Sequence, residues 1–187
     1  GRAGDSLTVN GIGFVDMAFS PKIAQPGELI DLVVTLSNFD RSNSANDIAF
    51  SNDLDSALSG LSAVGLPLND VCGAGSTISG TSSLTFSGGT VAASDTCTFT
   101  VPVQVPANAV SGSYTNNVTS ISSSLNGAYD DVLNSLIVSN APTMQMAIVE
   151  SDLSAGDDVT LRYTLTNIDT VNQATAVSFS TFVGSPS

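Results

Sequence analysis

The sequence GELIDLVVTLSNFD, at residues 27–40, returns at residues 156–169 as GDDVTLRYTLTNID. In both copies a glycine precedes a run in which apolar residues alternate with polar or β-branched ones, and this period of two is typical of a β-strand. We therefore expect a strand at residues 28–38 and its counterpart at residues 158–167. In the first copy, one alternating set is apolar and is predicted to face the core: Ile30, Leu32, Val34 and Leu36.

The repeat extends well beyond this run. Without a gap, residues 6–51 align with residues 135–180, and 15 of the 46 aligned positions are identical. A long repeat at a fixed offset, here 129 residues, indicates a tandem array. We expect residues 1–10 to be the last strand of a preceding repeat or a donor strand. Residues 11–141 would form one complete sandwich, and residues 142–187 about the first three strands of the next repeat.

Short runs of the same kind follow along the chain, separated by clusters of Gly, Pro, Asn and Ser. Roughly seven to nine strands at this spacing favour an all-β fold, an immunoglobulin-like antiparallel β-sandwich in tandem array. The Gly88-Gly89 pair is predicted to be a turn after a strand at residues 83–87, and residues 174–182 are expected to repeat the third strand. Eight side chains are expected in one core between two sheets: Leu32, Val34, Leu36, Phe50, Phe86, Phe99, Val101 and Val118.

The charge balance excludes several classes of partner. Seventeen acidic residues stand against four basic ones, and the net charge is −13. A nucleic-acid-binding surface needs a basic patch, and these cations are scattered, so no nucleic-acid partner is expected. No apolar run approaches the ~20 residues that span a bilayer, so we expect no membrane insertion in this segment. The four cations are Arg2, Lys22, Arg41 and Arg162.

The residue inventory also argues against an enzyme. The chain contains no histidine, which the Ser-His-Asp and Cys-His arrangements both need. No glycine-rich phosphate loop ends in lysine. The two glutamates, Glu28 and Glu150, are predicted at a turn and in an early strand rather than as a facing pair. We therefore expect no catalytic residues and no cofactor other than a possible calcium ion.

Two cysteines, Cys72 and Cys97, lie inside the complete repeat. Two cysteines can pair in only one way, and an all-β, threonine-rich chain favours an oxidising compartment, so a disulfide is expected. The alternative is a pair of buried free thiols. A zinc site would need two further soft ligands, and the sequence has none.

Calcium is the most plausible small partner, because carboxylate oxygens are the ligands that it prefers. No EF-hand spacing occurs, and the alternative is that these aspartates are solvated turn residues that hydrogen-bond to their own backbone. The candidate ligands are Asp53, Asp55, Asp130, Asp131, Asp157 and Asp158.

A covalent crosslink is a further hypothesis. Some surface sandwiches carry a Lys–Asn isopeptide bond, and Lys22 is the only lysine of the chain. Such a bond needs a buried acid beside it, and the sequence offers no obvious one.

Several phrases, in order, carry a family resemblance. They are FSPKIAQPGE (residues 19–28), LVVTLSN (32–38), IAFSNDL (48–54), VCGAGSTISGTSSLTFSGGTVAASDTCTFTVPV (71–103) and GSYTNNV (112–118). Together they resemble the immunoglobulin-like tandem repeats of bacterial cell-surface and adhesin-type proteins known as conserved-repeat domain of unknown function 11. The second copy departs from this pattern, because VESDLSAGDD at its start lacks the Ser-Pro. The resemblance implies an extracellular, cell-surface location and a structural or adhesive module without an active site.

Two functions are consistent with these observations. The first is a non-enzymatic extracellular structural module, a link in a cell-surface stalk, adhesin or fibre, whose partners are the neighbouring repeats. The alternative is a self-assembling filament subunit, whose identical copies are joined by strand sharing between chains. The segment at residues 7–9 is then the candidate donor strand.

Overall fold

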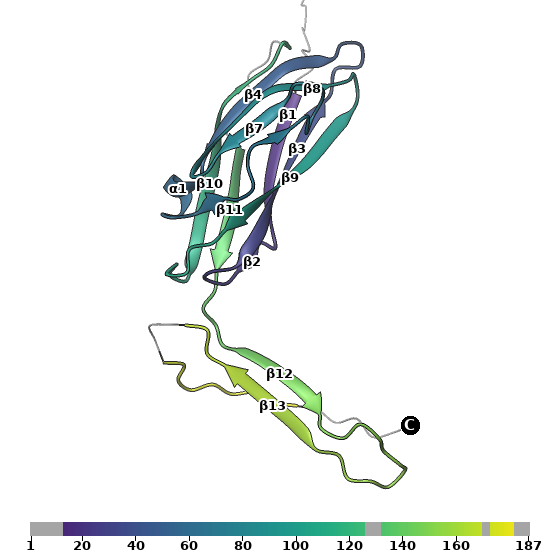
Figure 1. Ribbon diagram of the computed structural model, residues 1–187, viewed down its shortest axis with the longest axis vertical. Helices are drawn as coiled ribbons and strands as arrows, with labels where there is room; N and C mark the ends of the chain where they lie inside the picture. Colours follow the sequence, from purple (N-terminus) through teal and green to yellow (C-terminus); the bar gives the residue numbers. More distant parts are fainter. Residues whose placement is uncertain (1–12, 126–131, 170–172, 182–187) are drawn as a thin grey trace, which may run out of the picture. The chain divides into compact units, whose positions relative to one another are not determined.

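A computed structural model describes residues 13–125, 132–169 and 173–181. The chain divides into two compact units, one that runs to Ser139 and one that begins at Asn140 (Figure 1). The segment expected to be a donor or preceding strand, residues 1–10, lies outside the described residues.

The first unit is a sandwich of two β-sheets (Figure 1). The smaller sheet has the order β1-β3-β9-β5, and all of its neighbouring strands are antiparallel. Its strands are β1 (Gly13–Ser20), β3 (Leu29–Asn38), β9 (Thr96–Gln104) and β5 (Ser62–Ala63).

The larger sheet has the order β2-β11-β10-β4-β8-β7-β6 and is antiparallel except for the β2–β11 pair, which is parallel. A single helical turn, α1 (Leu54–Ala57), follows β4. The strands are β2 (Ile23–Ala24), β11 (Val132–Val138), β10 (Gly112–Ser122), β4 (Ala45–Asp53), β8 (Ser83–Val91), β7 (Thr77–Gly80) and β6 (Leu68–Asn69).

The core lies between these two sheets, as the alternation in the sequence predicts. In β3, the even-numbered residues from Ile30 to Asn38 are buried, while the residues between them are partly or fully exposed. All eight predicted core side chains are buried, and none is more than 8% exposed. The rings of Phe50, Phe86 and Phe99 stack across the core with centroid separations of 5.0 and 5.4 Å. The predicted all-β sandwich and its core are confirmed.

The second unit contains one antiparallel hairpin, β12 (Thr143–Ile148) with β13 (Leu161–Thr166). Its register repeats that of β1 and β3 exactly one repeat length earlier: Met146 lies opposite Tyr163, as Met17 lies opposite Val34. The same offset relates every other pair of the hairpin to a pair of the first unit.

Turn hydrogen bonds repeat as well. The carboxylate of Glu28 accepts the backbone N–H of Gln25 at 2.7 Å, and Asp157 accepts that of Ser154 at the same distance. Each turn also requires a glycine, because Gly27 and Gly156 have φ values of +79° and +98°, which residues with a Cβ rarely adopt. The two units therefore share local geometry as well as sequence.

Two strand predictions are wrong. The Gly88-Gly89 pair is not a turn but lies within the continuous strand β8. Gly88 has a φ of +70°, and a Cβ there would be 3.0 Å from the carbonyl oxygen of Gly75, so glycine permits a close approach rather than a reversal. The strand expected at residues 174–182 is absent from Ala174 to Thr181. Its first-unit counterpart, β4, pairs with β8 and β10, and the described part of the second unit has no strands equivalent to these two.

Candidate functional site

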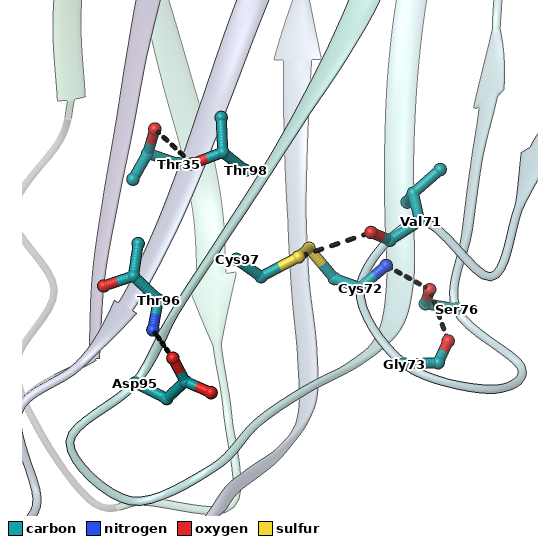
Figure 2. The surroundings of a disulfide bond; sticks show 9 residues. All are labelled: Thr35, Val71, Cys72, Gly73, Ser76, Asp95, Thr96, Cys97 and Thr98. Atoms are coloured by element: carbon teal, nitrogen blue, oxygen red, sulfur yellow. Dashed lines mark hydrogen bonds between the residues drawn. A yellow bond between two sulfur atoms is a disulfide. The ribbon is translucent and has the colours of Figure 1, made fainter.

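A disulfide connects the two sheets of the first unit. Cys97 lies on β9 in the smaller sheet, and Cys72 lies in the loop between β6 and β7 of the larger one, with a Cα–Cα distance of 5.9 Å (Figure 2). Cys72 is buried, and no free cysteine is present. The structure therefore favours the disulfide over the alternative of two free thiols.

The loop around Cys72 is fixed by its own hydrogen bonds (Figure 2). The backbone N–H of Cys72 donates to the hydroxyl oxygen of Ser76 at 2.9 Å, and this hydroxyl donates to the carbonyl of Gly73 at 2.8 Å. The loop is also tied to β8, because the N–H of Thr90 donates to the carbonyl of Cys72 at 2.8 Å. The cysteine is thus held in place by the backbone of its loop.

The aspartates expected to bind calcium mostly serve their own turns. Asp53 caps α1 and accepts the N–H of Ser56 at 3.2 Å, while Asp55 accepts the N–H of Gly60 at 2.7 Å. Asp157 accepts the N–H of Ser154, and Asp158 is exposed. Nowhere in the described ranges do three or more possible ligand residues gather. Two further candidates, Asp130 and Asp131, lie outside these ranges. The calcium site stays a prediction.

Three asparagines lie near one another on neighbouring strands of the larger sheet. Asn52 and Asn116 are fully buried and exchange hydrogen bonds between their carboxamides at 2.8 and 3.3 Å. Asn134 on β11 lies directly opposite Asn116 in the strand pairing. Its carboxamide nitrogen and oxygen are both buried and have no hydrogen-bond partner. A buried polar group without a partner costs about 1–3 kcal/mol, which makes this position a candidate for binding.

Asn134 lines a cleft of about 450 Å³ at the side of the sandwich. Met17 and Phe19 of β1 form its apolar wall, and Lys22, an exposed residue after β1, contributes the cation. The remaining wall is the edge of β11, with Leu133 on its surface. The cleft therefore combines an apolar surface, a positive charge and an unpaired carboxamide.

The backbone at this edge of β11 is also unpaired. The N–H groups of Ile137 and Ser139 donate to the carbonyls of Lys22 and Ala24 at 2.9 Å, so β2 covers one end of the strand. Backbone groups of alternate residues point to the same side of a strand, so those of Ser135 and Leu133 face this edge too. No described strand pairs with them there.

Lys22, the lysine expected for an isopeptide bond, lines the same cleft as Asn134. The chemistry also needs a buried acid, and none of the buried residues in the described part of the chain is an aspartate or a glutamate. The structure gives this crosslink no catalyst.

In the part of the chain that the structure describes, no helix is long and apolar enough to cross a bilayer.

The comparisons with known proteins concern the first unit most directly. A family model described as "Domain of unknown function (DUF7933)" matches residues 14–138. This is not the model of conserved-repeat domain 11, so the resemblance to that family stays a prediction. No curated protein sequence matches the chain.

A cohesin is among the solved structures that share the fold. The seventh ScaB type I cohesin from Pseudobacteroides cellulosolvens is 12% identical, with a TM-score of 0.51, and the match covers 75% of this chain and 99% of that one. A type I cohesin–dockerin complex from Clostridium thermocellum gives a TM-score of 0.47 at 12% identity and covers 66% and 98% of the two chains. At this level of identity the first likeness shows a common β-sandwich fold.

Proposed function

This chain belongs to the DUF7933 family of domains of unknown function, and we propose that it is a non-enzymatic structural module of an extracellular tandem array. In this role it is a link in a cell-surface stalk, adhesin or fibre, and its partners are the neighbouring sandwiches. The observation that carries the proposal is the hairpin of the second unit, which repeats β1 and β3 in register.

The exposure of this hairpin supports its assignment as the start of a second sandwich. Met17 and Leu36 are 2% and 1% exposed under the larger sheet, while their counterparts Met146 and Leu165 are 58% and 43% exposed. Apolar side chains at equivalent positions of the two units need an equivalent covering sheet. Each Å² of apolar surface left in water forgoes about 25 cal/mol of stabilisation.

The segment after β13 supports the same assignment. The ring of Phe179 lies 5.0 Å from that of Tyr163. Their counterparts in the first unit are Phe50 and Val34, which lie on the two facing sheets of the core. Phe179 therefore begins to cover the hairpin as β4 covers β3.

The disulfide supports an extracellular location. Structural disulfides persist in oxidising compartments and are rare in the reducing cytosol. Cohesin-like folds are also compatible with a module that acts through protein contacts, although the fold alone names no partner.

A hybrid chain tests the array. Because Ser180 corresponds to Ser51, residues 1–180 followed by a second copy of residues 52–139 would complete the second sandwich. We expect the backbone amides of β12 and β13 to exchange with solvent in this hybrid as slowly as those of β1 and β3. In the 187-residue chain they should exchange much faster.

The matched control carries Leu161→Asp in the same hybrid, since Leu161 is the counterpart of Leu32, which is fully buried. A charge at this position should prevent the second core from forming and leave the hairpin amides exchanging fast. The array is ruled out if the amides of the hybrid hairpin exchange as fast as in the 187-residue chain while the first unit stays folded.

A second candidate function is a filament subunit whose copies share strands. The exposed apolar face of β12 and β13 favours it, because an unpaired sheet edge with apolar side chains is normally covered. Amide exchange of the hybrid chain over a range of concentrations distinguishes the two functions. In a link of a longer array the second hairpin is protected within one chain at every concentration, whereas in a filament subunit its protection rises only as copies associate.

A further inference from the structure

Several strands in the described part of this chain have an unpaired edge, and two of these edges, one in each unit, match each other. The first is the edge of β11 at Leu133 and Ser135, beside the unpaired carboxamide of Asn134. The second is the outer edge of β12, which is paired only with β13. An unpaired edge presents a row of N–H and C=O groups that another strand can satisfy.

The surroundings of the two edges have opposite charge, and both present apolar side chains. Lys22 supplies a positive charge to the cleft beside β11. Residues 140–187 carry five acidic side chains and one basic one, a net charge of 1 − 5 = −4. The acidic Glu150 follows β12 by two residues, and β12 exposes Met144, Met146 and Ile148 to 47%, 58% and 55%.

We infer that β12 of one copy of this chain adds as a strand to the free edge of β11 in a second copy. A strand parallel to β11, like β2, directs the end of β12 and Glu150 toward Lys22. The backbone of β12 then pairs with Leu133 and Ser135, and strand addition of this kind draws its affinity from main-chain hydrogen bonds.

The side chains of the cleft complete the contact. Met146 packs against the apolar wall that Met17 and Phe19 form. Asn134 donates from its nitrogen and accepts at its oxygen, which satisfies a peptide group of the incoming strand and removes the cost of its buried, unpaired carboxamide.

The contact joins two different surfaces, so it is heterologous and does not close on itself in a dimer. An assembly of any number of copies therefore keeps one free β11 edge and one free β12 edge. This inference goes beyond the proposed structural role and fails independently of it, because the second sandwich of the hybrid chain can form whether or not copies associate.

Complementation between two variants tests the contact. Lys22→Glu blocks the cleft and leaves β12 intact, whereas Met146→Glu blocks β12 and leaves the cleft intact. In analytical ultracentrifugation we expect the unmodified chain to form species of increasing mass as its concentration rises. Each variant alone should stay monomeric, and an equimolar mixture should form heterodimers and nothing larger.

The controls make the same charge changes elsewhere. Arg41→Glu alters an exposed cation away from the cleft, and Ala147→Glu alters the residue next to Met146, which points to the opposite side of β12. Both should associate like the unmodified chain. A monomeric unmodified chain, a mixture without heterodimers, or a Lys22→Glu variant that still dimerises through its hairpin would overturn the inference.

Asn134→Leu separates binding from folding. Removing an unpaired buried carboxamide should raise the melting temperature of the monomer, because leucine has no polar group to leave without a partner. The same change should weaken association about tenfold, the effect of losing two hydrogen bonds of ~0.7 kcal/mol each. A variant that melts higher and associates as tightly as the unmodified chain contradicts the role given to Asn134.

Discussion

Single polar residues in this sandwich act mainly on their own turns. Asn38 is 2% exposed, and its side chain donates to the carbonyls of Asn43, Val91 and Ala92 while it accepts the N–H of Asp40. The equivalent bond from Asp169 to Asn167 occurs in the second unit. The identities in the repeat at these positions therefore follow from turn geometry and need no ligand to explain them.

Asp40 continues this network into the next turn. Its carboxylate accepts the backbone N–H of Ser42 at 2.8 Å and that of Asn43 at 2.9 Å. These hydrogen bonds, the one from Ser42 first, hold the pKa of Asp40 below its ordinary value of 3.8. The folded protein thus favours the charged form, so Asp40 contributes stability above its unfolded pKa and loses it as the pH falls through the folded pKa.

Asp40→Asn should therefore lower the free energy of unfolding at neutral pH, because the amide is a weaker acceptor for these N–H groups. The difference from the unmodified chain should shrink as the pH falls below 3.8. Urea unfolding at a series of pH values measures it. Asp31→Asn, at an exposed position of β3, is the control, and an equal, pH-independent loss in both variants would contradict the assignment.

At the scale of elements, the disulfide joins the β6–β7 loop to β9 across a sequence separation of 25 residues. On the chain-entropy model, a loop of this length stabilises the folded state by about 3.5 kcal/mol, because it restricts the unfolded chain. The double variant Cys72→Ala, Cys97→Ala should lose roughly this free energy of unfolding, plus the packing of the two sulfur atoms.

Urea unfolding of the double variant and of the reduced unmodified chain measures the loss. The single variants leave one free thiol and serve as the comparison for side-chain packing. A double variant as stable as the disulfide-bonded chain would mean that the bond restricts the unfolded state little.

Most elements could be predicted from local pattern, since alternation in β3 and β9 and the Pro26-Gly27 turn are local signals. The strand β7 could not, because Thr77–Gly80 is short, rich in small residues and held by pairing with Phe86 and its neighbours on β8. The same long-range pairing makes Gly88 a strand residue. Conversely, residues 174–181 have the sequence of a strand but lack the partners that would make one.

The candidate cleft was harder to predict than the fold. The sequence offered Cys72 and Cys97 directly, because two cysteines have a single pairing. Asn134 gave no signal, since it follows Val132 and Leu133 without clear alternation, and only the pairing with β10 determines which way its side chain points. Spatial neighbours such as Lys22 and Asn134 are far apart in the sequence and meet only in the assembled sandwich.

At the scale of the whole molecule, the two units differ in how much they bury. The first has a continuous core, while the hairpin of the second leaves its apolar residues 43% exposed or more at Met144, Met146, Ile148 and Leu165. A two-stranded hairpin of this kind is marginally stable in water. Local opening should therefore be far more frequent in the second unit than in the first.

Limited proteolysis of the dilute 187-residue chain should consequently cut first after Ser139 and leave the first unit intact. Mass spectrometry of the products identifies the surviving fragment. Survival of the second unit for as long as the first would contradict this expectation, and cleavage inside β3 or β9 would contradict the assigned core.

The bond between Cys72 and Cys97 also limits how far a sandwich can lengthen under tension. When a pulling force separates the strands, the covalent link transmits that force directly from one cysteine to the other, and the residues between them cannot straighten. At about 3.4 Å per residue, a separation of 25 residues withholds roughly 85 Å of extended chain. Each module that unfolds under force would therefore lengthen the chain by less. The strands β7 and β8, both inside the covalent loop, would carry no load.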